Sequence, residues 1–516
     1  MGGLAPTHES LRLNTPSAHD DDARADALAT LRGGSGMAPP LLDQPLANFA
    51  TRAPVSCSPD TPIRTVLEAM EREAIGAMVI VDADRRPVGV FTLRDVLEKV
   101  ALPQTDPTRP ISTVMDGTLW TLPSGAQGFE AAVLMARVGI RYVLVVDGGR
   151  LAGVVSESRL FSVWRGGIGD ASAVIRVARN VDEMAAATAG IRALVDRLLE
   201  ERMPAESVTR VITTLNDLVT ERLIEIVGGA ALLERAGGCW IALGSQGRGE
   251  QTLATDQDNA IIFADSEDVE ARRQTLLPVA RQANEALDRC GFPLCRGDVM
   301  ASNPRWCLSL AEWRQRFARW IDEPDPQALL NAAIFFDFRP ICGNHAIATD
   351  LRAWLAQYAE DRGRFLLPMA RNALENRPPL GLMRDFVLAR GGEHPDTLDL
   401  KVNGVQLFVE SARIYSLADG VTATNTHERL AGMAKARNLR GREAEAWGEA
   451  FRFIQLLRLR LNATQRARGE PLHNHVDPAT LNDLDRRVLK EALRQARNFQ
   501  SRMARDFSVT GASFGA

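Results

Sequence analysis

The sequence is poor in cysteine, with six among 516 residues, and none of them forms a CxxC pair. A disulfide framework and a zinc knuckle are therefore not indicated, and reduced thiols are the simplest interpretation. The chain also has no uninterrupted apolar run of the roughly 18 residues that span a bilayer, and its N-terminus lacks the charged-then-apolar pattern of a signal peptide. We therefore expect a cytoplasmic protein with no membrane partner.

An excess of charge of one sign is missing as well. Lys and Arg number 61 against 65 Asp and Glu, a formal charge of -4, so no overall field attracts nucleic acid or anionic lipid. We expect no nucleic-acid partner. The length of 516 residues exceeds one ordinary domain and predicts roughly three to four folding units.

Composition and hydrophobic patterning divide the chain into five parts. Residues 1–43 mix Gly, Pro, Ser and acidic residues, which predicts a disordered tail. Residues 44–165 contain an internal repeat, 166–236 read as two or three helices, 237–345 mix strands and helices, and 346–516 read as a helical bundle. The pattern predicts a multidomain α+β protein.

The repeat in residues 44–165 has the order helix, strand, turn, strand, helix. Its first copy carries AMVIVD (Ala77–Asp82) and PVGVFT (Pro87–Thr92), and its second carries YVLVVD (Tyr142–Asp147) and RLAGVVS (Arg150–Ser156). We call these copies the first repeat and the second repeat. Together they resemble a tandem pair of cystathionine-β-synthase (CBS) modules, which are regulatory units. The resemblance implies an adenine nucleotide regulator, AMP or ATP, in a cleft between the modules.

The ribose-binding pattern of such modules is a Gly, a Ser or Thr three residues on, and an Asp three later. The first repeat matches it with Gly89, Thr92 and Asp95. A hydroxyl at a helix start can meet a phosphate, and a carboxylate one turn later can accept from ribose hydroxyls. Alternatively, Thr92 only caps the helix. We expect one binding cleft rather than two, because the second repeat has Gly153 and Ser156 followed by Arg159.

One apolar stripe dominates residues 166–236. Such a stripe packs against another helix of this chain or of a second chain, so a homodimer stays open beside ordinary core packing. Met203 and Pro204 mark a helix break before it. The stripe consists of Val208, Val211, Ile212, Leu215, Leu218, Val219, Leu223 and Ile226.

The stretch CWIALGSQGRGEQTLATDQDNAIIF, residues 239–263, places a glycine-rich turn between two strands. Gly244 lets the backbone approach a phosphate closely, Ser245 adds a hydroxyl, and the amides that follow can face an anion. Asp256 and Asp258 are two residues apart. On extended backbone, both carboxylates therefore point to one side and can share divalent cations.

This arrangement resembles the nucleotidyltransferase superfamily, whose signature is a Gly-Ser turn, an Asp-x-Asp strand and a third carboxylate from a later strand. The resemblance implies a nucleoside triphosphate (NTP) substrate and two Mg²⁺ ions, with Asp256 and Asp258 as metal ligands. Asp298 is the candidate third catalytic carboxylate, in a segment that reads as a strand before a turn at Asn303.

GRGE, DQDN, VMASNP and FFDFRPICGN together look like a family that joins a CBS pair to a nucleotidyltransferase-like domain, related to protein-PII uridylyltransferases. Those enzymes move UMP from UTP to a tyrosine hydroxyl on a small signalling protein. Asp337 and Arg339 match their Asp-x-Arg, whereas Asn344 replaces a later Asp. Arg339 suits the paired oxygens of a triphosphate. Arg248 is assigned to the same nucleotide site, and pairing with Glu250 is its alternative.

The helical C-terminal part carries weaker signals. Lys401 lies next to a turn, where it either neutralises phosphate or is an ordinary solvated lysine. Arg458, Arg460, Arg466 and Arg468 form a basic run without interleaved aromatic residues, which is typical of a solvated helix face.

We therefore predict a tandem CBS pair, a nucleotidyltransferase-like mixed α/β domain and a C-terminal helical bundle. The leading hypothesis is a uridylyltransferase-like nucleotidyltransferase that moves NMP from Mg-NTP to a hydroxyl acceptor on a small signalling protein. An adenine nucleotide at the CBS pair would regulate it. The alternative is a catalytically inactive nucleotide-binding sensor or interaction protein. An RNA or antibiotic acceptor is a third hypothesis.

Overall fold

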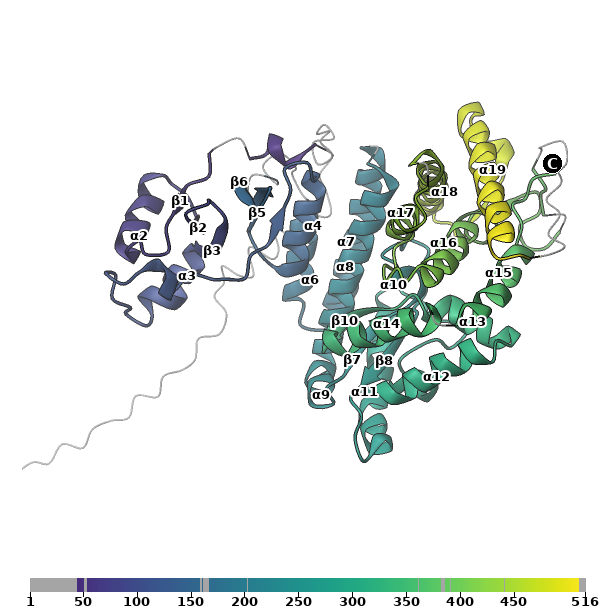
Figure 1. The fold of residues 1–516 in the computed structure, drawn as a ribbon, viewed down its shortest axis with the longest axis horizontal. Coiled ribbons are helices and arrows are strands. Elements are labelled where there is room, and N and C mark those ends of the chain that lie inside the picture. The colour runs from purple at the N-terminus through teal and green to yellow at the C-terminus, as the bar shows by residue number, and fades with distance from the viewer. Residues whose placement is uncertain are drawn as a thin grey trace, which may run out of the picture.

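The structure is a computed structural model that describes residues 44–50, 53–157, 160, 167–201, 203–360, 362–381, 386–389, 391–439 and 441–509. The expected tail, residues 1–43, lies outside the described residues. Figure 1 shows an elongated arrangement, with the two repeats at one end, the C-terminal helices at the other and a central sheet with its helices between them.

The two repeats have the same fold, which confirms the repeat predicted from the sequence. In each, a short first strand pairs in parallel with a second strand, which pairs antiparallel with a third. The first repeat contains β1 (Ser56–Cys57), α2 (Ile63–Arg72), β2 (Ala77–Val81), β3 (Pro87–Thr92) and α3 (Leu93–Asp95). The second contains β4 (Thr121–Leu122), α4 (Gly128–Val138), β5 (Tyr142–Asp147) and β6 (Arg150–Ser156).

The hydrophobic cores of the repeats differ in extent. The first repeat has a core of its own, which includes Ile80 and Phe91. The second repeat contributes Phe129 and its neighbours to a core that continues through the following helices to the central sheet. The repeats also pack closely on each other, because a Cβ on Gly76 would lie 2.1 Å from the hydroxyl oxygen of Tyr142.

Helices join the repeats to the central sheet. In the described residues 167–235 these are α6 (Ile168–Val177), α7 (Val181–Glu200), α8 (Ala205–Ile226) and α9 (Gly229–Arg235), one more than the sequence predicted. The break between α7 and α8 falls at Met203 and Pro204, as expected. The apolar stripe of α8 is buried within this chain from Val208 to Leu223, so core packing accounts for it.

The central sheet has the strand order β10-β7-β8-β9, with β8 antiparallel to β7 and parallel to β9. Every residue of β7 and β8 is buried, which explains their almost continuous apolar sequences. The strands are β7 (Cys239–Ala242), β8 (Asn259–Phe263), β9 (Cys307–Ser309) and β10 (Arg339–Gly343). The helices around them are α10 (Gly244–Gly247), α11 (Val269–Arg289), α12 (Leu310–Asp322) and α13 (Pro326–Phe335).

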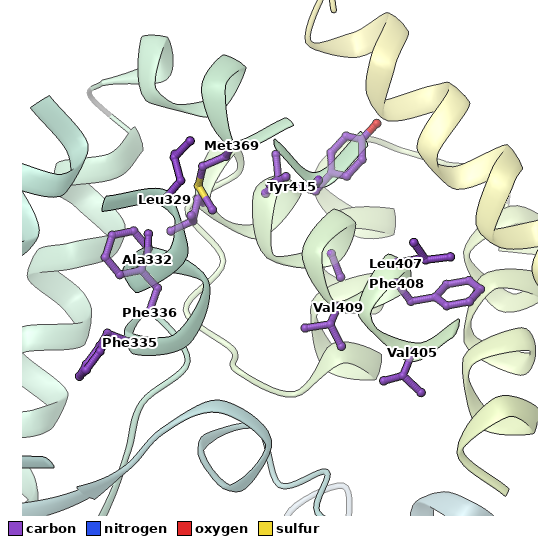
Figure 2. Packing of buried hydrophobic residues seen from close by; sticks show 14 of the residues in the cluster. Leu329, Ala332, Phe335, Phe336, Met369, Val405, Leu407, Phe408, Val409 and Tyr415 are labelled. Atoms are coloured by element: carbon purple, nitrogen blue, oxygen red, sulfur yellow. The ribbon is translucent and has the colours of Figure 1, made fainter. Parts of the chain in front are cut away.

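The C-terminal region is helical, as predicted, and it shares one core with the sheet. Figure 2 shows part of this core, with Phe335 and Phe336 at the end of α13 and Phe408 and Tyr415 on α16. The helices are α14 (His345–Glu360), α15 (Leu366–Glu375), α16 (Gln406–Ala418), α17 (Thr426–Ala436), α18 (Gly441–Ala467) and α19 (Asp483–Asp506). A small antiparallel sheet consists of β11 (Leu398–Asp399) and β12 (His475–Val476).

The state of the cysteines and the character of the helices bear on two expectations from composition. The six cysteines are free thiols, in keeping with their spacing in the sequence. Among the helices that the structure describes, none combines the length and the apolar character that a bilayer crossing requires.

Candidate active site

The glycine-rich turn after β7 lies directly against one of the two predicted acids. Gly244 has a φ of +54°, and a Cβ there would lie 3.0 Å from Oδ2 of Asp258. A Cβ on Gly247 would lie 1.8 Å from the carbonyl oxygen of Asp337, so neither position accommodates a side chain. Ser245 is half-buried in the same turn. The first amides of a helical turn have no intrahelical acceptor, which leaves them available to a bound oxygen.

Asp256 and Asp258 lie together just before β8. A carboxylate oxygen of each and the Cys295 sulfur all lie within 4.8 Å of one another. Asp256 is exposed, whereas Asp258 and Cys295 are half-buried. The structure thus brings the two acids of the Asp-x-Asp pattern to one side of the chain and adds a thiol that the sequence did not indicate.

A buried cluster of amide side chains positions the acids. Gln257 lies between them, and its Nε2 donates to the carbonyl oxygens of Asn284 (2.9 Å) and Phe292 (2.8 Å). Asn284 Nδ2 donates in turn to Gln257 Oε1 (2.7 Å) and Asn259 Oδ1 (3.0 Å), and Asn259 Oδ1 also accepts from the amide of Ala301 (2.8 Å). Asn259 and Asn284 were not predicted from the sequence. Amides within otherwise apolar faces of β8 and α11 are the signal that could have revealed them.

The electrostatics of the two acids favour a cation. Burial, and then the negative charge of Asp256, raise the pKa of Asp258 to about 6. A hydrogen bond from Cys295 and the positive charges of Lys401 and Arg248 act in the opposite direction. A divalent cation between the carboxylates would relieve their repulsion. Two carboxylates suit the preference of Mg²⁺ for oxygen, with water and phosphate oxygens as further ligands, whereas the thiol does not.

Asp298 does not join this group of ligand atoms. It lies in a turn with a φ of +54°, and its Oδ2 accepts a hydrogen bond from Asn303 Nδ2 at 2.9 Å. Its carbonyl oxygen accepts from Trp306 Nε1, also at 2.9 Å. The expected strand at Asp298 is wrong, because the Gly-Asp and Asn-Pro pairs form turns here and β9 begins only at Cys307.

Arg339 contacts protein groups rather than open space. Its terminal nitrogens lie 2.8 and 3.0 Å from the two carboxylate oxygens of Asp217 on α8, and Nη2 donates to the carbonyl oxygen of Gln246 at 3.0 Å. Gln246 Nε2 donates to the same carboxylate at 3.2 Å. Arg339 therefore links the glycine-rich turn to α8, and its direct contact with the triphosphate stays a prediction.

Asp337 lies at the centre of a buried network of ion pairs. Its carboxylate is 0% exposed and pairs with Arg248, Arg413 and Arg429, each at 2.7 Å. Burial alone would raise the pKa of Asp337, but the three guanidinium groups hold it well below its usual range. Arg248 also pairs with Glu250 at 2.8 Å, which confirms the alternative stated for it. The network connects α16 and α17 to the turn, and its members Arg413 and Arg429 were not predicted from the sequence.

The helical C-terminal region contacts the turn at two further places. Asn425 Nδ2 donates to the carbonyl oxygen of Arg248 at 3.1 Å, and Arg458 Nη2 donates to Thr252 Oγ1 at 3.3 Å. The interpretation of Arg458 as part of a solvated face is wrong, because its side chain is 5% exposed and burial lowers its pKa to about 10. Arg460 is exposed, as expected.

In the first repeat, Thr92 and Asp95 bond to each other. Thr92 Oγ1 donates to Asp95 Oδ2 at 2.6 Å, and the Thr92 amide donates to the same oxygen at 2.8 Å. Lys99 pairs with the other carboxylate oxygen at 2.7 Å. The bond from the Thr92 amide, together with a bond from the Asp95 amide to Thr92 Oγ1 at 3.4 Å, forms the capping box of α3, the alternative stated from the sequence. Gly89 lies on β3, and Arg159 of the second repeat lies outside the described residues.

Family models match most of the chain. The model described as "Putative nucleotidyltransferase DUF294" matches residues 189–327, and the model described as "Putative nucleotidyltransferase substrate binding domain" matches residues 363–507. The CBS domain model matches residues 46–102 and 111–166, which hold the two repeats. The CBS pair and the nucleotidyltransferase-like domain predicted from the sequence are thereby confirmed.

Individual relatives match shorter parts. An uncharacterized protein of Methanocaldococcus jannaschii is 29% identical over 128 residues, which are 22% of this chain and 30% of that protein. An uncharacterized protein of Methanopyrus kandleri is 30% identical over 120 residues, which are 23% of this chain and 61% of that protein. This chain thus spans less than two thirds of the length of either relative.

Solved structures match a similar share of the chain. A CBS domain protein from Pyrobaculum aerophilum complexed with AMP is 30% identical and covers 22% of this chain and 88% of its own, with a TM-score of 0.21. An uncharacterized conserved protein from Pyrococcus horikoshii is 23% identical and covers 24% of this chain and 94% of its own, with a TM-score of 0.23.

Proposed function

Because the chain belongs to the family that joins a CBS pair to a DUF294 nucleotidyltransferase domain and its substrate-binding domain, we propose that it transfers NMP from a Mg²⁺-bound NTP to a hydroxyl group. One observation carries the proposal. Asp256 and Asp258 share a cluster of ligand atoms, and Asp258 lies 3.0 Å from the position of a Cβ on Gly244. A polyphosphate against the turn would therefore meet the cations held by the acids.

The residues of the site have distinct roles in this proposal. Bound Mg²⁺ would neutralise charge on the attacking and leaving oxygens of an in-line displacement. Asp256 and Asp258 hold the cations, and Lys401, whose charge acts on Asp258, offers a further positive charge to the departing pyrophosphate. The acceptor hydroxyl loses its proton as the new P–O bond forms. We assign that proton to Asp298, which must first give up its hydrogen bond from Asn303.

Substrate and acceptor are assigned more finely by resemblance. The Asp337-x-Arg339 match to protein-PII uridylyltransferases supports UTP as the nucleotide and a hydroxyl on a small signalling protein as the acceptor. Arg248 and Arg339 support nucleotide binding by fixing the turn that carries Gly244 and Ser245. We place the protein in the cytoplasm, because free thiols suit a reducing compartment.

An adenine nucleotide at the first repeat is the proposed regulator. Its phosphate would meet Thr92, and its ribose hydroxyls would compete for the carboxylate of Asp95, which now accepts from Thr92 and Lys99. Regulation requires that the nucleotide bind one conformation of the protein more tightly than another. The second repeat connects that difference to α8 through Glu130 and Arg210, 3.8 Å apart.

Transfer can be measured directly. The full-length protein is incubated with Mg²⁺, each α-³²P-labelled NTP in turn and a cell lysate, and label on protein is separated from label on RNA or small molecules. We expect labelled protein with UTP, and a loss of at least about a hundredfold in Asp256→Asn and Asp258→Asn. Glu267→Gln removes an exposed carboxylate of the same domain and should label like the wild type.

The second candidate is a nucleotide sensor without transfer activity. It is favoured by the position of Asp298 outside the cluster of Asp256, Asp258 and Cys295. Tight binding of an NTP that depends on Asp256 and Asp258, without label transfer to any acceptor and without pyrophosphate release, would establish this candidate and contradict the transferase. Absence of both binding and transfer would contradict both.

A further inference from the structure

A cavity of about 460 Å³ lies outside the proposed transferase site. It is formed where α12 and α13 meet the short helix Pro304–Trp306, and its lining includes Arg305, Trp306, Arg316, Trp320 and Asn331. Small-molecule sites typically have volumes of roughly 300–1,000 Å³. The cavity is therefore large enough for a small organic ligand.

Two arginines of this cavity, Arg305 and Arg316, lie against the same tryptophan ring. The guanidinium groups of Arg305 and Arg316 lie 5.1 and 5.5 Å from the ring centroid of Trp306, and Arg316 Nη1 donates to the carbonyl oxygen of Arg305 at 2.7 Å. Burial, and then the positive charge of Arg305, lower the pKa of Arg316. Within the described residues, neither arginine has a carboxylate within ion-pair distance, whereas Arg319 in the same cavity pairs with Glu323 at 3.7 Å.

The other acids of the cavity wall have partners elsewhere. Glu312 accepts from the amide of Ser309 at 2.8 Å and pairs with Arg273 at 2.5 Å. Asp325 accepts from the amide of Ala328 at 2.7 Å as the N-cap of α13. The wall also keeps the negative charges of Asp325 and of Glu312, which acts on Arg316, so the positive charges without an ion-pair partner in the described residues are those of Arg305 and Arg316. A phosphomonoester carries about -1.5 to -2 charges at pH 7 and presents several acceptor oxygens, so it matches them better than a single carboxylate does.

We propose that this cavity binds the phosphate group of a small phosphomonoester between the guanidinium groups of Arg305 and Arg316. The site is separate from the NTP site, but one loop serves both. Cys295, beside the two acids, begins this loop, and Trp306 Nε1 donates to the carbonyl oxygen of Asp298 within it at 2.9 Å. A ligand on Arg305 therefore restrains the backbone that carries the proposed proton acceptor.

Titration calorimetry of the full-length protein with glucose 6-phosphate, in a buffer without phosphate, tests the proposal. We expect the wild type to bind, the Arg305→Gln/Arg316→Gln variant to bind at least about tenfold more weakly, and Arg319→Gln to bind within about twofold of the wild type. Arg305 is exposed, so the single variant Arg305→Gln should fold normally and still show weakened binding.

Two comparison ligands sharpen the test. Glucose 6-sulfate, a monoanion of similar shape, should bind more weakly than glucose 6-phosphate, and inorganic phosphate should bind more weakly because it leaves most of the cavity empty. Equal binding of glucose 6-phosphate to the wild type and the double variant would overturn the site. If glucose 6-sulfate bound as tightly as glucose 6-phosphate, the preference for a doubly charged phosphate would be wrong. If inorganic phosphate bound as tightly as glucose 6-phosphate, the cavity would not recognise the organic part of the ester. Asp258→Asn should leave all these affinities unchanged, so the result is independent of transferase activity.

Discussion

The two CBS repeats share a strand order and a register but differ in what surrounds them. Ser56 pairs with Val79 in the first repeat as Thr121 pairs with Leu144 in the second. The first repeat keeps its own small core and the complete Gly-Thr-Asp pattern. The second has lost the Asp, and its core is continuous with the helices and the sheet of the transferase region.

This difference indicates a division of labour within a duplicated fold. The first repeat has a core of its own and meets the second repeat in a small cluster of Val79, Leu144 and Leu151, so a change in its ligand state would reach the transferase region only through the second repeat. The second repeat cannot move without displacing α8, because Phe129 and the residues around it pack in the same core as the stripe of α8. Recognition is thus expected in the first copy and mechanical attachment in the second.

The largest test removes one phenylalanine from each core. Phe129→Ala and Phe91→Ala delete side chains that are 4% and 0% exposed, and each should cost about 3–5 kcal/mol of local stability. Phe129→Ala should also speed hydrogen exchange in β7 and β8, because its core reaches Trp240 and Ile261. Phe91→Ala should speed exchange in the first repeat alone. Equal loss of protection in the central sheet would show that the cores are not distinct.

The contributions of Asp258, beside the central sheet, and of Asp95, in the first repeat, to stability should depend on pH in opposite senses. The pKa of Asp258 is raised to about 6, so the folded state binds its proton more tightly than the unfolded state. Its stabilising contribution is present below the unfolded value of about 3.9 and is lost as pH rises through about 6. Mg²⁺ should restore stability of the sheet above pH 6, and Asp258→Asn should remove both effects. A melting temperature that stays the same when Mg²⁺ is added at pH 7.5 would contradict the cation site.

Asp95 of the first repeat provides the contrast. Burial raises its pKa, but the hydrogen bonds from Lys99 and Thr92 together lower it by more than burial raises it. The net shift of the pKa is therefore downward. Its contribution to stability is present above the unfolded value and is lost as pH falls through the lower folded value. Acid should therefore loosen the first repeat while it protonates Asp258, and hydrogen exchange at pH 3 to 7 can follow both regions in one sample.

A smaller difference between the repeats is expected in the free energy of AMP binding. Asp95→Ala should weaken AMP binding at least about tenfold, which corresponds to about 1.4 kcal/mol, because the ribose acceptor is lost. Ser156→Ala, at the corresponding hydroxyl of the second repeat, should leave the affinity unchanged. Calorimetry on the full-length protein measures both. A larger loss in Ser156→Ala would reverse the assignment of the two clefts.

The smallest effect is expected at the contact between the second repeat and α8. Arg210 lies 3.8 Å from Glu130 and 5.7 Å from the ring centroid of Phe129. Partly exposed pairs contribute about 0–1 kcal/mol, so Arg210→Gln should reduce the response of NMP transfer to AMP by up to about fivefold without changing AMP affinity. Arg94→Gln removes an exposed arginine paired within the first repeat and is the matched control. An equal response in both variants would argue against transmission through Arg210.

Features with a local cause could be predicted from the sequence. The matching segments AMVIVD and YVLVVD revealed the repeat, Pro204 revealed the start of α8, and Gly244 revealed the turn beside the acids. The remaining features depend on partners far away in the chain. Arg458 reads as a surface charge until Thr252, 206 residues earlier, is seen to accept from it, and Arg413 has no visible role until Asp337 lies beside it.

The course of α8 has a consequence for anyone who prepares fragments of this protein. A fragment that starts at residue 237 would lack Asp217, the anchor of Arg339, and the helix that covers one face of the sheet. Trp240 and Phe263, now 2% and 0% exposed, would then face water. Such a fragment should aggregate and be poorly soluble. A useful truncation should begin before Ala205 so that it retains the whole of α8.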